Sequence, residues 1–241
     1  MMKRVAEVSP RLKARIAGVL YLVAGMTFSY AYGSVGGKLV VYSDAAATAH
    51  NILTNEKLFR LGFAAALISA VCYITVTLLF YDMFKPVNGS VSLLAAFFSL
   101  MGCTIQALSS FFHLAPLVVL GGEPYLGVFK VEQLQALALM FLRLRAPASS
   151  IYMVFFGWYC LLIGYLIFRS TFLPRILGVF MAIAGLSYQL FLSPPLASYL
   201  FPYVVKPAGA LGELSLILWL LIVGVNSQRW RDQASAAGMR T

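Results

Sequence analysis

Residues 58–80 read LFRLGFAAALISAVCYITVTLLF, an apolar run that contains one charged residue, Arg60. An α-helix rises about 1.5 Å per residue, so about 20 apolar residues cross a hydrocarbon layer about 30 Å thick. The run is long enough to do so. We therefore expect it to form a membrane-spanning helix.

The rest of the chain repeats this pattern. Five further apolar runs occupy residues 16–32, 91–120, 149–168, 174–190 and 208–225. They predict an all-α fold, a bundle of six transmembrane helices over 16–225, with a basic N-terminal segment (1–15) and a C-terminal tail (226–241). The run at 91–120 is long enough that we expect it to tilt, to kink or to emerge near Pro116.

Composition supports this class. Of the 241 residues, 61% are hydrophobic and only 11% are charged, and the mean hydropathy is +0.86. Soluble domains have about 25% charged residues, so an ordinary soluble globule is excluded. The abundance of apolar residues also excludes a disordered chain, and three cysteines exclude a disulfide framework.

The basic residues predict how the chain is threaded. With six spans, eleven Lys and Arg residues fall on the side of the two termini and seven on the other side. Because Lys and Arg near helix ends favour the cytoplasm, we expect both termini to be cytoplasmic. A basic fringe beside anionic lipid explains the net charge of +10 without a nucleic-acid partner.

The segments on the predicted outer side, 33–57, 121–148 and 191–207, are long, and two of them are expected to be partly helical. Ser43 or Asp44 is suited to cap a helix that begins at residue 45. In 131–144, apolar residues recur at helical spacing, with Arg143 and Arg145 off the apolar stripe. This amphipathic helix is predicted to lie on the outer surface, to dip into the membrane or to cover the bundle.

Four polar residues interrupt the apolar runs and are the candidate ligand-binding residues. They are Arg60, Gln106, His113 and Glu213. The rise per residue and the predicted threading place Arg60, His113 and Glu213 in the outer leaflet, with Gln106 about two turns deeper than His113 on the same helix face. The four predict a polar recognition site at the outward end of the bundle. The alternative is a structural ion pair between Arg60 and Glu213.

Trp158 and Tyr159 are two further candidate ligand-binding residues. They belong to an aromatic cluster, FFGWY (155–159), in the middle of a predicted span. Tryptophan is more usual at the membrane interface, so the cluster is a candidate lining for an apolar pocket. Ordinary packing inside the bundle is the alternative.

Motifs of known chemistry do not occur. The chain has two histidines, and its three cysteines are widely spaced. A zinc, haem or dithiol site is therefore not expected. Nor does the sequence contain a P-loop, a dinucleotide-binding motif or a Gly-x-Ser-x-Gly elbow. We predict no catalytic residue, no metal and no cofactor.

Several segments resemble the domain-of-unknown-function 4386 family of bacterial integral membrane proteins. They are SDAAATAHNILTNEKLFRLGF (43–63), KPVNGSVSLLAAFF (85–98), LQALALMFLRLR (134–145), FFGWYCLLIGYLIFRSTFLPRILGV (155–179) and GELSLILWLL (212–221). The resemblance implies a topology and a bacterial inner-membrane location, but no established reaction. It marks as motif positions Arg60, Pro86, Asn88, Tyr165, Arg175 and Glu213. Where this chain has Tyr159, the family often has histidine, which weakens the case for an enzyme.

These observations lead to a non-enzymatic hypothesis. The protein is expected to bind a lipid or another apolar small molecule, or to serve as an accessory subunit of a membrane complex. Its expected partners are membrane lipids, other integral membrane subunits or a second copy of the chain. The alternatives are a small-solute or proton-coupled transporter and an intramembrane lipid-modifying enzyme.

Overall fold

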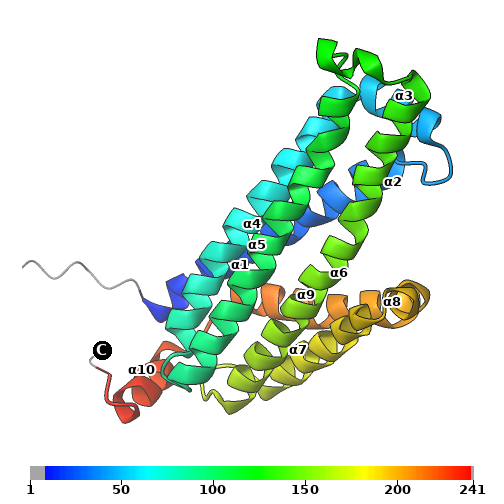
Figure 1. Ribbon diagram of the computed structural model, residues 1–241. Coiled ribbons are helices and arrows are strands. Elements are labelled where there is room, and N and C mark those ends of the chain that lie inside the picture. The colour runs from blue at the N-terminus through cyan, green and yellow to red at the C-terminus, as the bar shows by residue number, and fades with distance from the viewer. Residues whose placement is uncertain (1–8, 240–241) are drawn as a thin grey trace, which may run out of the picture. The chain divides into compact units, whose positions relative to one another are not determined.

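The computed structural model describes residues 9–239, apart from the side chain of Ser34. Within this range every regular element is a helix, which confirms the predicted all-α class. In chain order the elements are α1 (Pro10–Ser29), the π-helix η1 (Tyr30–Val35), α2 (Gly36–Leu39), α3 (Ala45–Thr54), α4 (Glu56–Phe84), α5 (Gly89–Val119), the 3₁₀-helix η2 (Pro124–Val128), α6 (Val131–Arg169), α7 (Arg175–Tyr188), the 3₁₀-helix η3 (Gln189–Leu192), α8 (Pro194–Leu200), the π-helix η4 (Phe201–Val205), α9 (Lys206–Ile222) and α10 (Ser227–Ala236). Figure 1 shows them coloured along the chain.

Six helical stretches of the described chain are long and apolar enough to cross a membrane, which confirms the predicted number. They are Pro10–Leu39, Glu56–Phe84, Gly89–Leu120, Val131–Arg169, Arg175–Leu192 and Pro194–Ile222. Most extend beyond the predicted apolar runs. Residues 1–8 of the predicted N-terminal segment (1–15) and residues 240–241 of the predicted tail lie outside the described residues.

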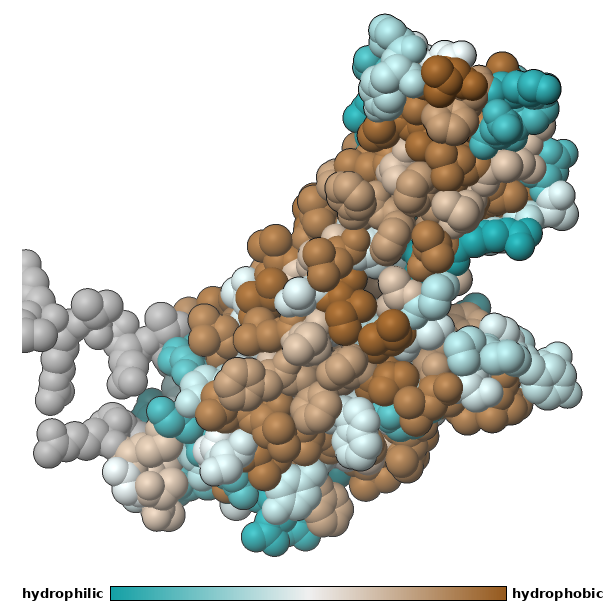
Figure 2. Space-filling model, viewed as in Figure 1, coloured by the Kyte–Doolittle hydropathy of each residue, from teal (hydrophilic) through white to brown (hydrophobic). Residues whose placement is uncertain are grey.

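The outward faces of these helices carry large apolar side chains. Along α4, for example, Ile68, Val71 and Leu78 are exposed. Figure 2 shows such residues in brown over most of the long helices on one face, with hydrophilic residues in teal near helix ends. An apolar outer surface of this kind is suited to lipid rather than to water.

The predicted connections are more helical than expected. Asp44 caps α3, because its Oδ1 accepts the backbone N–H of Ala47 at 2.9 Å. The prediction of a loop over 191–207 is wrong, because most of this segment is helical. It contains α8 and η4, which continue into α9. Its prolines stand at the first or second position of α8, η4 and α9. At the start of α8 the first N–H groups have no partner within the helix, so Pro194 and Pro195 do not weaken it.

Helix α6 corrects a second expectation. The sequence predicted an amphipathic helix over 131–144 and a separate span from residue 149, but α6 runs through Pro147 without a break. Ser149 and Ser150 donate from their hydroxyls to the carbonyls of Arg145 and Ala146, at 3.0 and 3.3 Å. These are bonds from each hydroxyl to the carbonyl four residues earlier in the same helix, a pattern that often bends a helix without ending it. The first half of α6 is therefore part of a membrane-length helix.

The chain folds as two compact units, and each long helix from α1 to α6 contributes to both. The first unit comprises residues 1–22, 73–102 and 153–241, and the second comprises 23–72 and 103–152. Each is described by itself below.

In the first unit, α7 packs closely against both α6 and α9, and glycines make the approach possible. A Cβ atom at position 164 would lie 2.7 Å from the carbonyl oxygen of Gly178, and one at position 185 would lie 2.7 Å from that of Gly157. On α9, a Cβ at position 212 would lie 2.8 Å from the carbonyl oxygen of Phe180. Small residues that let backbones meet in this way are typical of membrane helix pairs.

In the second unit, an apolar core joins the connecting helices to the long ones. It is formed by Val35, Leu39, Ile52, Phe59 and Leu142, all of them buried. Polar side chains add links between the helices and the backbone. For example, the hydroxyl of Ser69 donates to the carbonyl of Ala24 at 2.9 Å.

Candidate functional site

Glu213 lies on α9 in the first unit and is held by two tyrosines. The hydroxyl of Tyr21 donates to Glu213 Oε2 at 3.3 Å, and the hydroxyl of Tyr188 donates to Oε1. Both tyrosine rings are buried. The carboxyl group therefore has neutral hydrogen-bond donors on both oxygens, one from α1 and one from α7.

Glycine residues position this carboxyl group. A Cβ atom at position 209 would meet the phenol of Tyr188, and a Cβ at position 212 would lie 2.7 Å from Cβ of Ala184. Because both positions are glycine, α9 can approach α7 closely enough for Tyr188 to reach Glu213.

Tyr159 is connected to the Tyr21 side of Glu213 through ring contacts. Its ring centroid lies 5.8 Å from that of Tyr73, which in turn lies 5.2 Å from that of Tyr21. Trp158 lies elsewhere. Its side chain is 46% exposed and stacks on Phe98, with ring centroids 6.1 Å apart. Neighbouring residues on a helix point about 100° apart, so Tyr159 and Trp158 do not share a pocket.

Arg60 has a partner on its own helix. Its Nε donates to Glu56 Oε1 at 2.6 Å, one helical turn away, and both side chains are substantially exposed. Arg60 belongs to the second unit and Glu213 to the first. The ion pair between them, and the convergence of both with His113 around a substrate, therefore stay predictions.

Gln106 and His113 lie on one buried face of α5 in the second unit. Gln106 Nε2 donates to the carbonyl of Ala66 at 3.2 Å. His113 Nε2 lies 2.9 Å from the carbonyl of Phe59, so this nitrogen carries the proton and donates. The imidazole also stacks on the ring of Phe59, with centroids 4.0 Å apart. Both side chains thus bind α5 to the backbone of α4.

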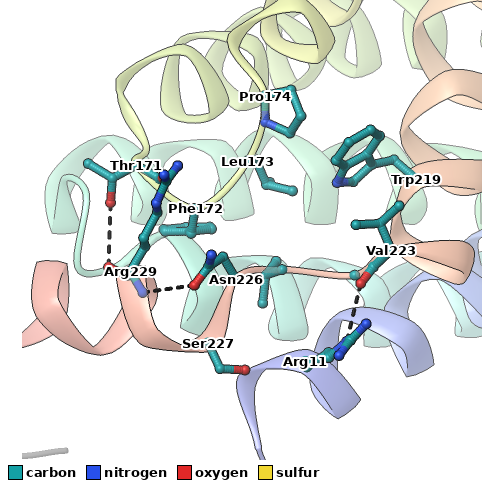
Figure 3. Close-up of a pocket in the computed structure, with 12 residues that line it drawn as sticks. Arg11, Thr171, Phe172, Leu173, Pro174, Trp219, Val223, Asn226, Ser227 and Arg229 are labelled. Carbon is teal, nitrogen blue, oxygen red and sulfur yellow. Dashed lines mark hydrogen bonds between the residues drawn. The ribbon is translucent and has the colours of Figure 1, made fainter.

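A pocket of about 550 Å³ opens in the first unit where α1, α9, α10 and the turn from α6 to α7 meet. Figure 3 shows Arg11 on one side, Arg229 beside Thr171 on the other, and Trp219 on the wall. None of the twelve residues that line it is acidic. Neither Arg11 nor Arg229 forms an ion pair with any residue that the structure describes.

The local sequence builds this pocket. Helix α9 ends at Ile222, and Gly224 follows two residues later with a φ of 75°, in the left-handed region that glycine adopts without strain. Arg11 Nε donates to the carbonyl of Val223 at 3.3 Å, which places the arginine over the end of α9 (Figure 3). Asn226 then caps α10 by accepting the backbone N–H of Arg229 at 3.1 Å. Arg229 Nη1 also donates to the carbonyl of Thr171 at 3.5 Å. Each guanidinium is thus held by one backbone carbonyl and keeps further N–H groups for a ligand.

The pocket therefore combines a cationic rim with an apolar wall. The rim supplies charge-assisted donors, which suit phosphate or carboxylate oxygens. The wall is formed by Phe172, Leu173, Pro174, Trp219, Val223 and Val225. An amphiphile with an anionic head group matches both surfaces.

Sequence reasoning did not single out this pocket. Arg11 and Arg229 were counted only as members of the basic fringe, since nothing in the sequence brings residues 218 positions apart together. One local signal could have located part of the pocket. Gly224 and Asn226 lie between an apolar run and a polar one, and such residues mark the end of one helix and the start of the next.

No curated protein and no solved structure matches the chain significantly. A family model does match, over residues 16–224. Its description is "Domain of unknown function (DUF4386)". The match covers Glu213 and five of the membrane-length helices in full, together with the first from residue 16 on, and the resemblance inferred from the sequence is confirmed. The chain therefore belongs to the DUF4386 family of multi-pass helical proteins.

Proposed function

We propose that the protein binds an anionic phospholipid, with the phosphate at Arg11 and Arg229 and the upper acyl chains along the apolar wall of the same pocket. The observation that carries the proposal is the pairing of two arginines without an acidic neighbour in the lining of a pocket at the ends of membrane-length helices. Each arginine near an anionic lipid surface contributes about 1 kcal/mol to binding.

The proposal includes a location. The pocket lies on the side of the chain that has the excess of Lys and Arg, which the threading argument assigns to the cytoplasm. We place the protein in a bacterial inner membrane with both termini in the cytoplasm, where anionic head groups face this pocket. Service as an accessory subunit, or assembly with a second copy, is compatible with a bound lipid.

The double variant Arg11→Ala, Arg229→Ala tests this assignment. Its affinity for short-chain phosphatidylglycerol, measured by native mass spectrometry in a neutral detergent, is expected to fall about tenfold or more, because two phosphate contacts are lost. Short-chain phosphatidylcholine serves as the comparison lipid, and its weaker binding is expected to change less.

Arg15→Ala, Arg231→Ala is the matched control. It removes the same charge, and Arg15 also donates to the end of α9, to the carbonyl of Ile222 at 3.4 Å, but neither residue lines the pocket. Equal losses in the two double variants would mean that general charge, rather than this pocket, holds the lipid.

Proton-coupled transport is a second candidate, and Glu213 favours it. The carboxyl group lies within a membrane-length helix and has two hydroxyl donors, Tyr21 and Tyr188, in place of a cation among the described residues. A carboxyl group held by neutral donors can gain and lose a proton without breaking an ion pair.

For this candidate, Glu213→Gln is the decisive variant. In proteoliposomes that contain a pH-sensitive dye, proton flux driven by a membrane potential is expected to fall to the level of protein-free liposomes. Glu56→Gln, on an exposed helix end, is expected to keep the wild-type flux. Wild-type protein that moves no more protons than empty liposomes would remove transport from consideration.

A further inference from the structure

The second unit contains a buried arginine, Arg145 on α6. It lies off the apolar stripe of 131–144, as the sequence indicated, yet its residue is only 8% exposed. The reason is that η1 and α2 cover this side of α6. A Cβ atom at Gly36 of α2 would lie 4.0 Å from Arg145 Nη1. Arg145 is therefore enclosed by its own unit.

One edge of this guanidinium has no partner. Nε and Nη2 of Arg145 are both buried, and neither forms a hydrogen bond with a residue that the structure describes. These two nitrogens carry the parallel N–H groups that pair with two oxygens of one carboxylate or phosphate. The flat face of the group is covered by Tyr32, whose ring centroid lies 4.0 Å from Arg145 Cζ. The ring covers the face of the guanidinium and accepts no hydrogen bond from Nε or Nη2.

The charge also lacks a counter-ion within the described part of the second unit. Its four acidic residues are Asp44, Glu56, Glu123 and Glu132. Asp44 caps α3, Glu56 pairs with Arg60, and Glu123 and Glu132 are exposed without a salt bridge to Arg145. A buried charge without a partner is costly, so a compensating anion is expected.

Hydrogen bonds fix the side chains that surround Arg145. Tyr32 lies on the π-helix η1, an uncommon backbone form that is frequent at functional sites. Its hydroxyl donates to Ser109 Oγ at 3.2 Å, and that hydroxyl donates to the carbonyl of Gln106 at 2.8 Å, so the ring is fixed over the guanidinium. His113 lies one turn further along α5, near enough for the charge of Arg145 to act on it. Its Nδ1 is buried and has no partner among the described residues.

We propose that Arg145 binds a singly charged oxyanion head group, a fatty-acid carboxylate or a phospholipid phosphodiester, at the edge formed by Nε and Nη2. One negative charge neutralises the one buried cation, and Nδ1 of His113 is available to accept a hydroxyl group of the same ligand. This site is separate from the pocket at Arg11 and Arg229, and its residues belong to the second unit.

The test measures binding of decanoate and of short-chain phosphatidylglycerol to the purified full-length protein in neutral detergent, by native mass spectrometry. It is made in the Arg11→Ala, Arg229→Ala background, so that lipid bound at the first pocket does not mask a change at Arg145. Arg145→Gln is expected to weaken one of the two at least tenfold, and the ligand that is lost identifies the source of the oxyanion. Decanol, which has the same chain without the charge, is expected to bind wild type and variant alike. Arg143→Gln is the control, because Arg143 is two residues away on the same helix, exposed, and donates to the carbonyl of Tyr42 at 2.6 Å.

A second measurement guards against misfolding of the variant. Without added ligand, Arg145→Met is expected to raise the midpoint of thermal unfolding by a few degrees. The substitution removes an uncompensated buried charge and keeps an unbranched apolar side chain in its place. Added decanoate or phosphatidylglycerol is expected to stabilise wild type and not this variant. The proposal is overturned if Arg145→Gln binds both ligands as wild type does, or if Arg145→Met lowers the midpoint, since the contact with Tyr32 would then satisfy the charge by itself.

Discussion

Gly178→Ala is expected to lower the free energy of unfolding by about 2 kcal/mol, although alanine is the better helix former. A Cβ atom at position 178 would lie 2.6 Å from the carbonyl oxygen of Gly164 and 2.8 Å from the backbone nitrogen of Phe168. Both are backbone atoms of α6, so no side chain can rotate away. Overpacking of this kind costs about 3 kcal/mol, and the gain in helix propensity returns about 1 kcal/mol. Far-UV circular dichroism during titration of the micelles with sodium dodecyl sulfate measures the change.

Gly25→Ala is the control for this prediction. Gly25 also lies inside a membrane-length helix, α1, but a Cβ atom there would have no described neighbour within 4 Å. Its replacement is expected to leave stability unchanged or to raise it by up to about 1 kcal/mol. Opposite signs for the two variants would support the close approach of α6 and α7. A gain in stability for Gly178→Ala would contradict it.

The sequence was sufficient to predict the parts of the fold that depend on the length of apolar runs and on local capping residues. Six runs of apolar residues predicted six membrane-length helices, and Asp44 was one of two residues expected to cap α3. These features depend on residues that are neighbours in the chain. Pro147 marks the limit of that reasoning, because a proline in isolation predicts a helix end, whereas α6 continues through it from Val131 to Arg169.

The candidate site was less predictable, since it depends on which distant residues meet. Glu213 stood out as a charge within an apolar run, but its donors, Tyr21 and Tyr188, did not. They lie 192 and 25 residues away from it. Tyrosines are common in membrane proteins, so neither had a distinctive pattern. The burial of Arg145 was not predictable for a related reason: the apolar stripe of one helix does not show which other elements cover its polar side.

Tyr188→Phe is expected to lower the free energy of unfolding by about 2 kcal/mol. The substitution keeps the ring, whose centroid lies 5.5 Å from that of Phe156, and removes only the hydroxyl that donates to Glu213 Oε1. A partly buried carboxyl group that loses a donor has no water to replace it in a membrane, and such a loss costs about 1 to 3 kcal/mol. The same detergent titration measures it. Tyr203→Phe, at a side chain that is 75% exposed, is expected to have almost no effect.

A double-mutant cycle assigns this loss to the hydrogen bond rather than to the ring. In a Glu213→Leu background the carboxyl group is gone, so Tyr188→Phe has no acceptor to leave unpaired, and its cost is expected to fall below about 0.5 kcal/mol. Removing both partners of a buried hydrogen bond is often nearly neutral, whereas removing one is not. If Tyr188→Phe cost the same in both backgrounds, the hydroxyl of Tyr188 would be acting elsewhere, and Glu213 would depend on Tyr21 alone for the donor that holds it.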